Sequence, residues 1–155
     1  MPLIDSLAAA LERPREVTPQ VSHHVIETYG IAREAVGEPI LVFPSEDLMP
    51  LSVYYHGRNV LVPVPRPPSY AYWDQSTFVI HGPEDVARVL EESAPGAAGL
   101  WVHTNKYGKH WGYDQLESFL ARNYRQDERQ DFARGVVLRH FVPNQTGPAL
   151  ANDPP

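Results

Sequence analysis

Side chains capable of binding a ligand are concentrated directly after one apolar segment, Leu100–Thr104. Residues 103–111 include two histidines, an amide, two lysines and a tryptophan: His103, Asn105, Lys106, Lys109, His110 and Trp111. Lysine binds phosphate as a point charge, and an aromatic face attracts cations. We therefore expect this loop to bind an anionic or sugar-like ligand. The alternative is a solvated loop in which Trp111 packs on the following helix.

An aromatic loop at residues 70–75 is the second candidate binding site. Tyr70, Tyr72 and Trp73 stand beside an acid and an amide in this loop. Exposed aromatic side chains suit a carbohydrate platform or a protein-binding patch. The pattern slightly favours the alternative, in which these aromatics cover a sheet edge beside the proline run 63–68.

The segment Pro44–Asp47 follows an apolar strand at the place where nucleotide-binding folds have a glycine-rich turn. Neither G-x-G-x-x-G nor G-x-x-x-x-G-K-[ST] occurs there, so we expect no dinucleotide binding. The acids Glu46 and Asp47 are expected to cap the following helix and to favour its dipole. Ser45 lacks the flanking glycines of a G-x-S-x-G nucleophile elbow, which disfavours serine hydrolase chemistry.

Seven histidines raise the question of a metal site. His23 and Glu27 are four residues apart on an expected helix, and His103 and His140 lie on strands that are potential neighbours. The sequence has no H-E-x-x-H motif and no His-x-His pair, and it has no cysteine for a thiolate site. We therefore expect no metal ion and no other cofactor.

Composition limits the classes of partner. The 155 residues carry a net charge of -6, which gives no basic surface for nucleic acid. No apolar run approaches the roughly 20 residues that span a bilayer. The apolar segment Leu3–Leu11 contains Asp5 and has no basic n-region, so it makes a poor signal peptide. Self-association through this amphipathic segment is one expectation.

Helix and strand patterns alternate along the chain. We expect helices at 3–11, 19–36, 48–56, 83–93 and 113–125, and strands at 39–43, 59–64, 77–80, 100–104 and 135–142. The run 126–131 is expected to be a charged turn, and the last strand to lie at a sheet edge. This order predicts an α/β fold, a three-layer Rossmann-like sandwich with a mostly parallel sheet of about five strands. The expected division is an amphipathic segment (1–16), one α/β domain (17–143) and a disordered tail (144–155).

Several apolar segments, taken in order, resemble the soluble C-terminal domains of polytopic membrane glycosyltransferases. They are Glu38–Pro44, Pro50–Tyr55, Leu100–Val102 and Phe132–Leu138. The family is the dolichyl-phosphate-mannose–protein mannosyltransferase superfamily, which uses polyprenyl-phosphate sugars. The resemblance covers roughly residues 21–142.

The resemblance implies a non-catalytic accessory domain that binds a sugar, a glycan or a sugar-phosphate group. In this family the catalytic acid lies in a loop between transmembrane helices, and no position of this chain matches it. The transferase residues of such an enzyme would lie outside this chain, which is either excised from a longer protein or free-standing. The compartment is extracytoplasmic if the resemblance holds and cytoplasmic otherwise.

Two other functions remain open from the sequence. One is a small enzyme with His103 or His110 as general base, since histidine titrates near neutral pH. The other is a protein-interaction module that uses residues 3–11 and the loop from Tyr70 to Trp73. In the accessory-domain hypothesis Trp101 is structural, and the ligand is held by the loop after residue 104.

Overall fold

The computed structural model describes residues 37–69, 71 and 74–145. Within these residues the strands are β1 (Ile40–Phe43), β2 (Leu61–Pro63), β3 (Leu100–Thr104), β4 (Tyr124–Asp131) and β5 (Val137–Pro143). The α-helices are α3 (Leu48–Tyr54), α4 (Pro83–Ser93) and α5 (Tyr113–Asn123). Short 3₁₀ helices are η1 (Ser45–Asp47), η2 (Gln75–Phe78), η3 (Lys106–His110) and η4 (Ala133–Gly135).

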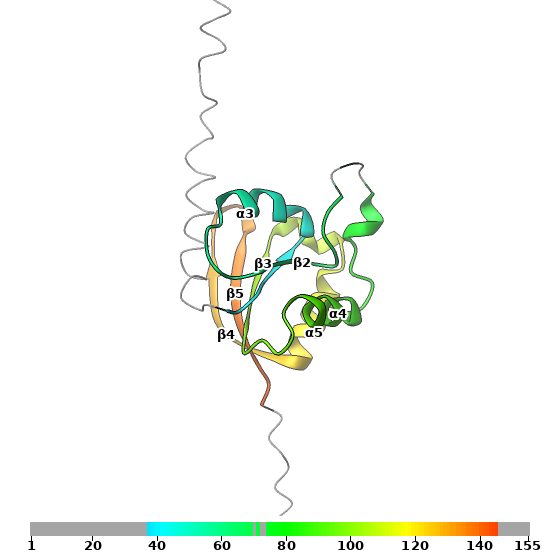
Figure 1. Ribbon diagram of the computed structural model, residues 1–155. Helices are drawn as coiled ribbons and strands as arrows, with labels where there is room; N and C mark the ends of the chain where they lie inside the picture. Colours follow the sequence, from blue (N-terminus) through cyan, green and yellow to red (C-terminus); the bar gives the residue numbers. More distant parts are fainter. Residues whose placement is uncertain (1–36, 70, 72–73, 146–155) are drawn as a thin grey trace, which may run out of the picture.

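The strands form one open sheet in the order β2-β1-β3-β5-β4 (Figure 1). β1 pairs in parallel with both β2 and β3, whereas β5 pairs antiparallel with both β3 and β4. The α/β class and the presence of five strands are confirmed, but the prediction of a mostly parallel sheet is wrong. The sheet is mixed because β4 and β5 follow α5 as a hairpin rather than as further crossover units.

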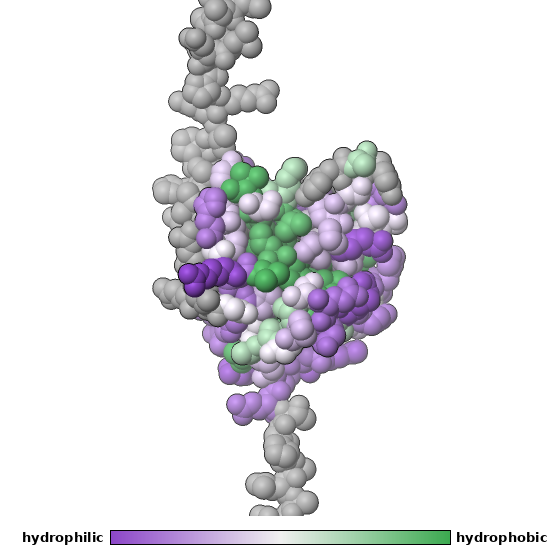
Figure 2. Space-filling view, in the orientation of Figure 1, coloured by the Kyte–Doolittle hydropathy of each residue, from purple (hydrophilic) through white to green (hydrophobic). Residues whose placement is uncertain are grey.

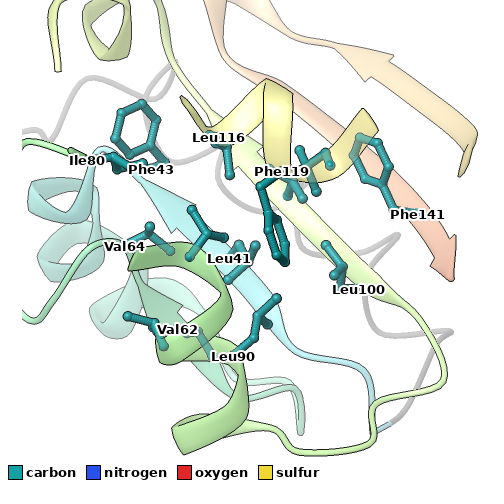
Figure 3. Packing of buried hydrophobic residues seen from close by; sticks show 14 residues of the cluster. Leu41, Phe43, Val62, Val64, Ile80, Leu90, Leu100, Leu116, Phe119 and Phe141 are labelled. Carbon is teal, nitrogen blue, oxygen red and sulfur yellow. The ribbon is translucent and has the colours of Figure 1, made fainter. Parts of the chain in front are cut away.

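Helices cover both faces of the sheet. On one face, Leu51 and Tyr55 from α3 and its C-terminal end pack against alternate residues of β1 and β3 and against Leu138. On the other face, α4 and α5 pack over the second set of alternate residues (Figure 3). That larger cluster contains Leu41, Phe43, Val62, Val64, Ile80, Val86, Val89, Leu90, Leu100, Val102, Leu116, Phe119, Leu120 and Phe141.

The two central strands are the best predicted elements. Every residue of β1 and β3 is buried. The sequence of a strand that is covered on both faces is a continuous apolar run, whereas a strand with one exposed face has an alternating pattern. The runs Ile40–Phe43 and Leu100–Val102 have this character, so their positions follow from the sequence.

Two local predictions are wrong. Residues 126–131 belong to β4, whose residues are mostly exposed and charged; β5 supplies the backbone partners that the side chains do not predict. The expected strand 77–80 is not formed: residues 77 and 78 belong to the 3₁₀ helix η2, and residues 79 and 80 to no strand. The Asp74 carboxylate stabilises η2 by accepting a hydrogen bond from the Ser76 amide at 3.0 Å. The apolar Phe78 and Ile80 are buried in the core all the same.

The predicted edge position of the last strand is also wrong, because β5 lies between β3 and β4. Its alternating pattern arises from Arg139, which is only 4% exposed. The guanidinium group of Arg139 lies 2.5 and 2.9 Å from the two Glu117 carboxylate oxygens and lies over the Phe141 ring. The charged residue in this strand therefore marks a partly buried ion pair, in which Arg139 is the enclosed partner.

The helices begin and end close to the expected positions. Pro83 occupies the first turn of α4, where its missing N–H breaks no helical hydrogen bond. Pro50 likewise lies in the first turn of α3, which ends at Tyr54, two residues earlier than expected. The expected helices 3–11 and 19–36 lie outside the described residues, as do Tyr72, Trp73 and residues 146–155 of the predicted tail.

The surface beside α3 is apolar (Figure 2). The exposed large hydrophobic residues of the described chain are Met49, Val53 and Val60, each more than half exposed. No helix in the described ranges combines the length and apolar character needed to cross a membrane.

Candidate functional site

The chain changes direction across the sheet at β1. From β1 it passes through α3 to β2 on one side, and from β2 through α4 to β3 on the other side. The segment leaving β1 leads to α3 on one face, and the segment leaving β3 leads to α5 on the opposite face. In open α/β sheets, ligands bind outside the carboxyl ends of the strands at such a switch point. The candidate site is therefore the space between η1 and η3.

One carboxylate joins the two sides of this switch point. Asp47 Oδ2 lies 2.8 Å from His103 Nε2 and accepts a hydrogen bond from Asn105 Nδ2 at 2.7 Å. The His103 side chain is 6% exposed and that of Asp47 is 23% exposed. The Asp47 side chain makes no capping hydrogen bond to α3. Asp47 is the N-cap residue of α3, as expected, but its side chain does not cap the helix; the carboxylate instead ties η1 to the end of β3.

The two ring nitrogens of His103 have different surroundings. Nε2 faces the Asp47 carboxylate, whereas Nδ1 is buried and has no hydrogen-bond partner among the described residues. Because a carboxylate can only accept, the contact places a proton on Nε2. The Ser45 hydroxyl, next to the same carboxylate in η1, is also buried without a described partner.

The loop after β3 is held by packing as well as by Asp47. Asn105 Oδ1 accepts a hydrogen bond from the Gly108 amide at 3.3 Å, and the Phe43 ring fills the space where a Gly108 side chain would project. Trp111 is half-buried and its ring stacks on Phe78 with the ring centroids 5.8 Å apart. The tryptophan thus packs on η2 and the core, so the alternative of a packed Trp111 describes its surroundings better than an open stacking surface does.

Cationic side chains surround the outer part of the site. Lys106, Lys109 and His110 of η3 are exposed. Arg134 in η4 is also exposed, and the neighbouring Gly135 lies against the aliphatic part of Lys106. The segment 132–136 therefore brings one further cation to this end of the sheet. Sequence reasoning missed Arg134; the Arg-Gly pair before an apolar strand was the available signal for a turn.

Acidic groups occupy the η1 side of the site. Glu46 lies beside Asp47 and is partly exposed. Burial, and secondly the negative charge of Asp47, raise the pKa of the Glu46 carboxyl above its usual range. The site thus pairs a cationic side, η3 and η4, with an acidic side, η1.

Of the predicted ligand-binding residues, the structure brings His103, Asn105, Lys106, Lys109, His110 and Trp111 to one end of the sheet. Tyr72 and Trp73 lie outside the described residues, so their position relative to this site stays a prediction.

Three surface grooves lined by described residues lie away from this site. The largest of the three has a volume of about 880 Å³ and is lined by Ala98, Arg125 and residues 142–145.

The histidines expected to be neighbours do not share a site. His103 and His140 lie on adjacent strands, but His103 contacts Asp47 whereas His140 contacts Glu38 and Asp127. In the described part of the chain, no three histidine or acidic side chains are grouped so as to hold a metal ion. His23 and Glu27 lie outside it.

Comparison with known proteins gives one weak structural match. No protein-family model matches the chain, and no curated protein does. One chain of a solved E. cuniculi Mtq2–Trm112 complex, described as responsible for the methylation of the eRF1 translation termination factor, resembles it at 12% sequence identity and a TM-score of 0.29. The match covers 79% of this chain and 93% of that chain. A TM-score this low carries no argument about fold or function.

Proposed function

We propose that this domain is a recognition module that binds an anionic sugar, such as a sugar phosphate, between η1 and η3. The observation that carries the proposal is the Asp47 carboxylate, which joins the segments leaving β1 and β3 at the switch point of the sheet. A loop held in this way presents its side chains with little conformational freedom left to lose on binding.

The distribution of charge favours this ligand class. Lys106, Lys109 and Arg134 offer cationic donors for a phosphate group. The partly exposed Glu46 carboxylate offers an acceptor to the hydroxyl groups of a sugar. The chain as a whole is acidic, with a net charge of -6. The cations gathered at one end of the sheet therefore distinguish that end as a place where an anion is attracted.

The family resemblance extends the proposal to a biological setting. In that setting the domain is a non-catalytic accessory part of a membrane glycosyltransferase and binds a sugar, a glycan or a sugar-phosphate group for it. The parallel unit β2-β1-β3, with helices on both faces, supports a Rossmann-like description of this half of the sheet. The β4–β5 hairpin is an addition to that unit.

A small enzyme is the second candidate, because a hydrogen-bonded carboxylate and imidazole, Asp47 and His103, lie at the switch point. However, Nε2 of His103 already faces Asp47, and Nδ1 is buried. A general base must come within hydrogen-bond reach of the proton that it takes. This geometry favours a positioning role for His103 over a catalytic one.

Calorimetric titration with glucose 1-phosphate, inorganic phosphate and uncharged methyl glucoside tests the proposal. We expect the sugar phosphate to bind more tightly than either fragment. Lys106→Gln combined with Lys109→Gln should weaken binding roughly tenfold, because two charge-assisted contacts are lost. The matched control is Arg122→Gln with Arg125→Gln, which removes the same charge from exposed positions on α5 and β4. Equal binding by both double variants would overturn the site.

Phosphate release from glucose 1-phosphate distinguishes the recognition module from the enzyme. The recognition module binds the probe and releases no phosphate. Release by the wild-type protein that is lost in His103→Asn, with the fold retained, would establish the enzyme instead.

A further inference from the structure

His140 on β5 is held by two carboxylates at the end of the sheet opposite to the proposed ligand site. Its Nε2 lies 2.7 Å from Glu38 Oε2, and its Nδ1 lies 2.6 Å from Asp127 Oδ1. The His140 side chain is 14% exposed, while those of Glu38 and Asp127 are 19% and 34% exposed. The cluster is thus mostly shielded from water.

Two carboxylates can be satisfied together only by the charged ring. The imidazolium carries a proton on each nitrogen, whereas neutral histidine has one N–H and one lone pair. In the neutral ring, one nitrogen lone pair would face a carboxylate oxygen at hydrogen-bond distance. The geometry therefore favours protonated His140.

The local backbone is shaped around this cluster. The β4–β5 register shifts between Gln126 and Glu128, which makes Asp127 the extra residue of a bulge opposite His140. Bulges re-aim side chains, and here the bulged residue supplies the second carboxylate. At Gly99 a side chain would overlap the Glu38 carboxylate and crowd His140 Nε2, so the absence of a Cβ leaves room for the pair.

The neighbours of His140 include one aromatic ring and several charged groups on β3, β4 and β5. Trp101 on β3 lies against the imidazole with ring centroids 4.7 Å apart, and an aromatic face attracts a cation. On β4, Glu128 is directly opposite His140 in the register and adds a third acid beside Asp127. Arg139, next to His140 on β5, points to the other face toward Glu117. His103 lies two residues from Trp101 and contacts Asp47.

We propose that His140 is a pH-responsive clasp, which in its protonated state ties the residues before β1 to the bulged edge strand β4 and on deprotonation releases one of them. Burial lowers the pKa of His140, but the hydrogen bonds that the ring donates to Asp127 and Glu38, together with their negative charges, outweigh it, so the net direction is upward. A histidine with a raised pKa in the folded state stabilises the fold fully below its unfolded value. That contribution is lost as the pH rises through the folded value.

Opening of β4 should follow the same dependence. Between the unfolded and folded pKa values of His140, the protection of β4 amides against hydrogen exchange should fall by up to about tenfold per pH unit, after correction for intrinsic exchange. The amides of β1 and β3 lie inside the sheet and should be more strongly protected throughout. Because global unfolding also frees His140 from its two carboxylates, their protection should carry the same dependence on pH.

The test combines an NMR titration of the His140 ring with hydrogen exchange of residues 124–131 on either side of the transition. We expect His140 to titrate above the usual histidine range, and Glu38→Gln and Asp127→Asn each to lower its midpoint. His140→Gln should remove the pH dependence of β4 protection, whereas His110→Gln, at an exposed histidine, should preserve it.

Two results would overturn the clasp. The first is a His140 midpoint at or below the usual histidine value in the wild-type protein. The second is β4 protection that depends on pH equally in the wild type and in His140→Gln. The two carboxylate variants keep the test decisive if His140→Gln fails to fold, because each retains the histidine and its NMR signal.

Discussion

His103 and His140 lie on adjacent strands and face the same side of the sheet, yet their surroundings differ. His103 has one carboxylate partner and an enclosed second nitrogen, whereas His140 has a carboxylate at each nitrogen. His103 therefore links its strand to one segment, η1. His140 contacts two further segments, one through each nitrogen.

Replacement of Asp47 by alanine tests the link between η1 and the end of β3. Two donors, on His103 and Asn105, would lose their acceptor, and we expect the free energy of unfolding to fall by about 1–3 kcal/mol. Urea unfolding measures the change. Glu46→Ala is the matched control, because it removes the adjacent acid; it should change stability by less than about 0.5 kcal/mol. Equal effects of the two changes would contradict the linking role of Asp47.

At the scale of elements, the turn between η3 and α5 depends on one glycine. Gly112 has φ +89, and a side chain there would collide with the backbone oxygen of Ile80, whose amide donates a hydrogen bond to Trp111 O at 2.9 Å. Gly96 has φ +69 but open space around it. We expect Gly96→Ala to cost about 1 kcal/mol from the left-handed backbone alone. Gly112→Ala should cost about 2–4 kcal/mol, because steric overlap is added.

Urea unfolding of the two glycine variants separates these contributions. The difference between them reports the close approach of Gly112 to Ile80. Equal losses of stability would mean that the turn can move away from Ile80 without penalty, and that the loop which bears the proposed site is less rigid than described.

Elements with a strong local pattern could be predicted from the sequence, and those fixed by a distant partner could not. The apolar runs of β1 and β3 and the helix α4 with its leading Pro83 follow from periodicity and turn chemistry. β4 has almost no apolar residues, and only its pairing with β5 makes it a strand. Residues 77–80 have the composition of a strand, but the Asp74 side chain stabilises a 3₁₀ turn instead.

Only part of the candidate site could be predicted from the sequence. The polar loop after Thr104 could be found because it directly follows a buried strand. The partnership of Asp47 with His103 could not, because the two residues are 56 positions apart and the sequence also allowed a capping role for the acid. Arg134 was missed because it follows a strand that had itself been interpreted as a turn.

At the scale of the whole molecule, stability should decrease from the centre of the sheet toward β4. β1 and β3 are buried throughout and have a strand on each side, whereas β4 is an edge strand with mostly exposed side chains. We expect amides of β1 and β3 to exchange only through global unfolding and those of β4 through local opening. Native-state hydrogen exchange measures both, and equal protection of β3 and β4 would contradict this order.

The charge distribution predicts how salt affects binding. The proposed ligand is an anion, the chain is acidic overall, and attraction comes from a few exposed cations at one end. Screening acts over roughly 8 Å at physiological ionic strength. The affinity for glucose 1-phosphate should therefore fall as sodium chloride is added, and the Lys106→Gln, Lys109→Gln double variant should show a shallower dependence. Calorimetry over a salt series would detect a salt-independent affinity, which would argue against a charge-based site.

An amide NMR titration with glucose 1-phosphate would locate the ligand site. We expect saturable shifts confined to residues 44–47, 104–112 and 132–136, the segments that meet at the carboxyl ends of β1 and β3. Shifts centred instead on the groove of Arg125 and residues 142–145, or no saturable shifts at all, would contradict it.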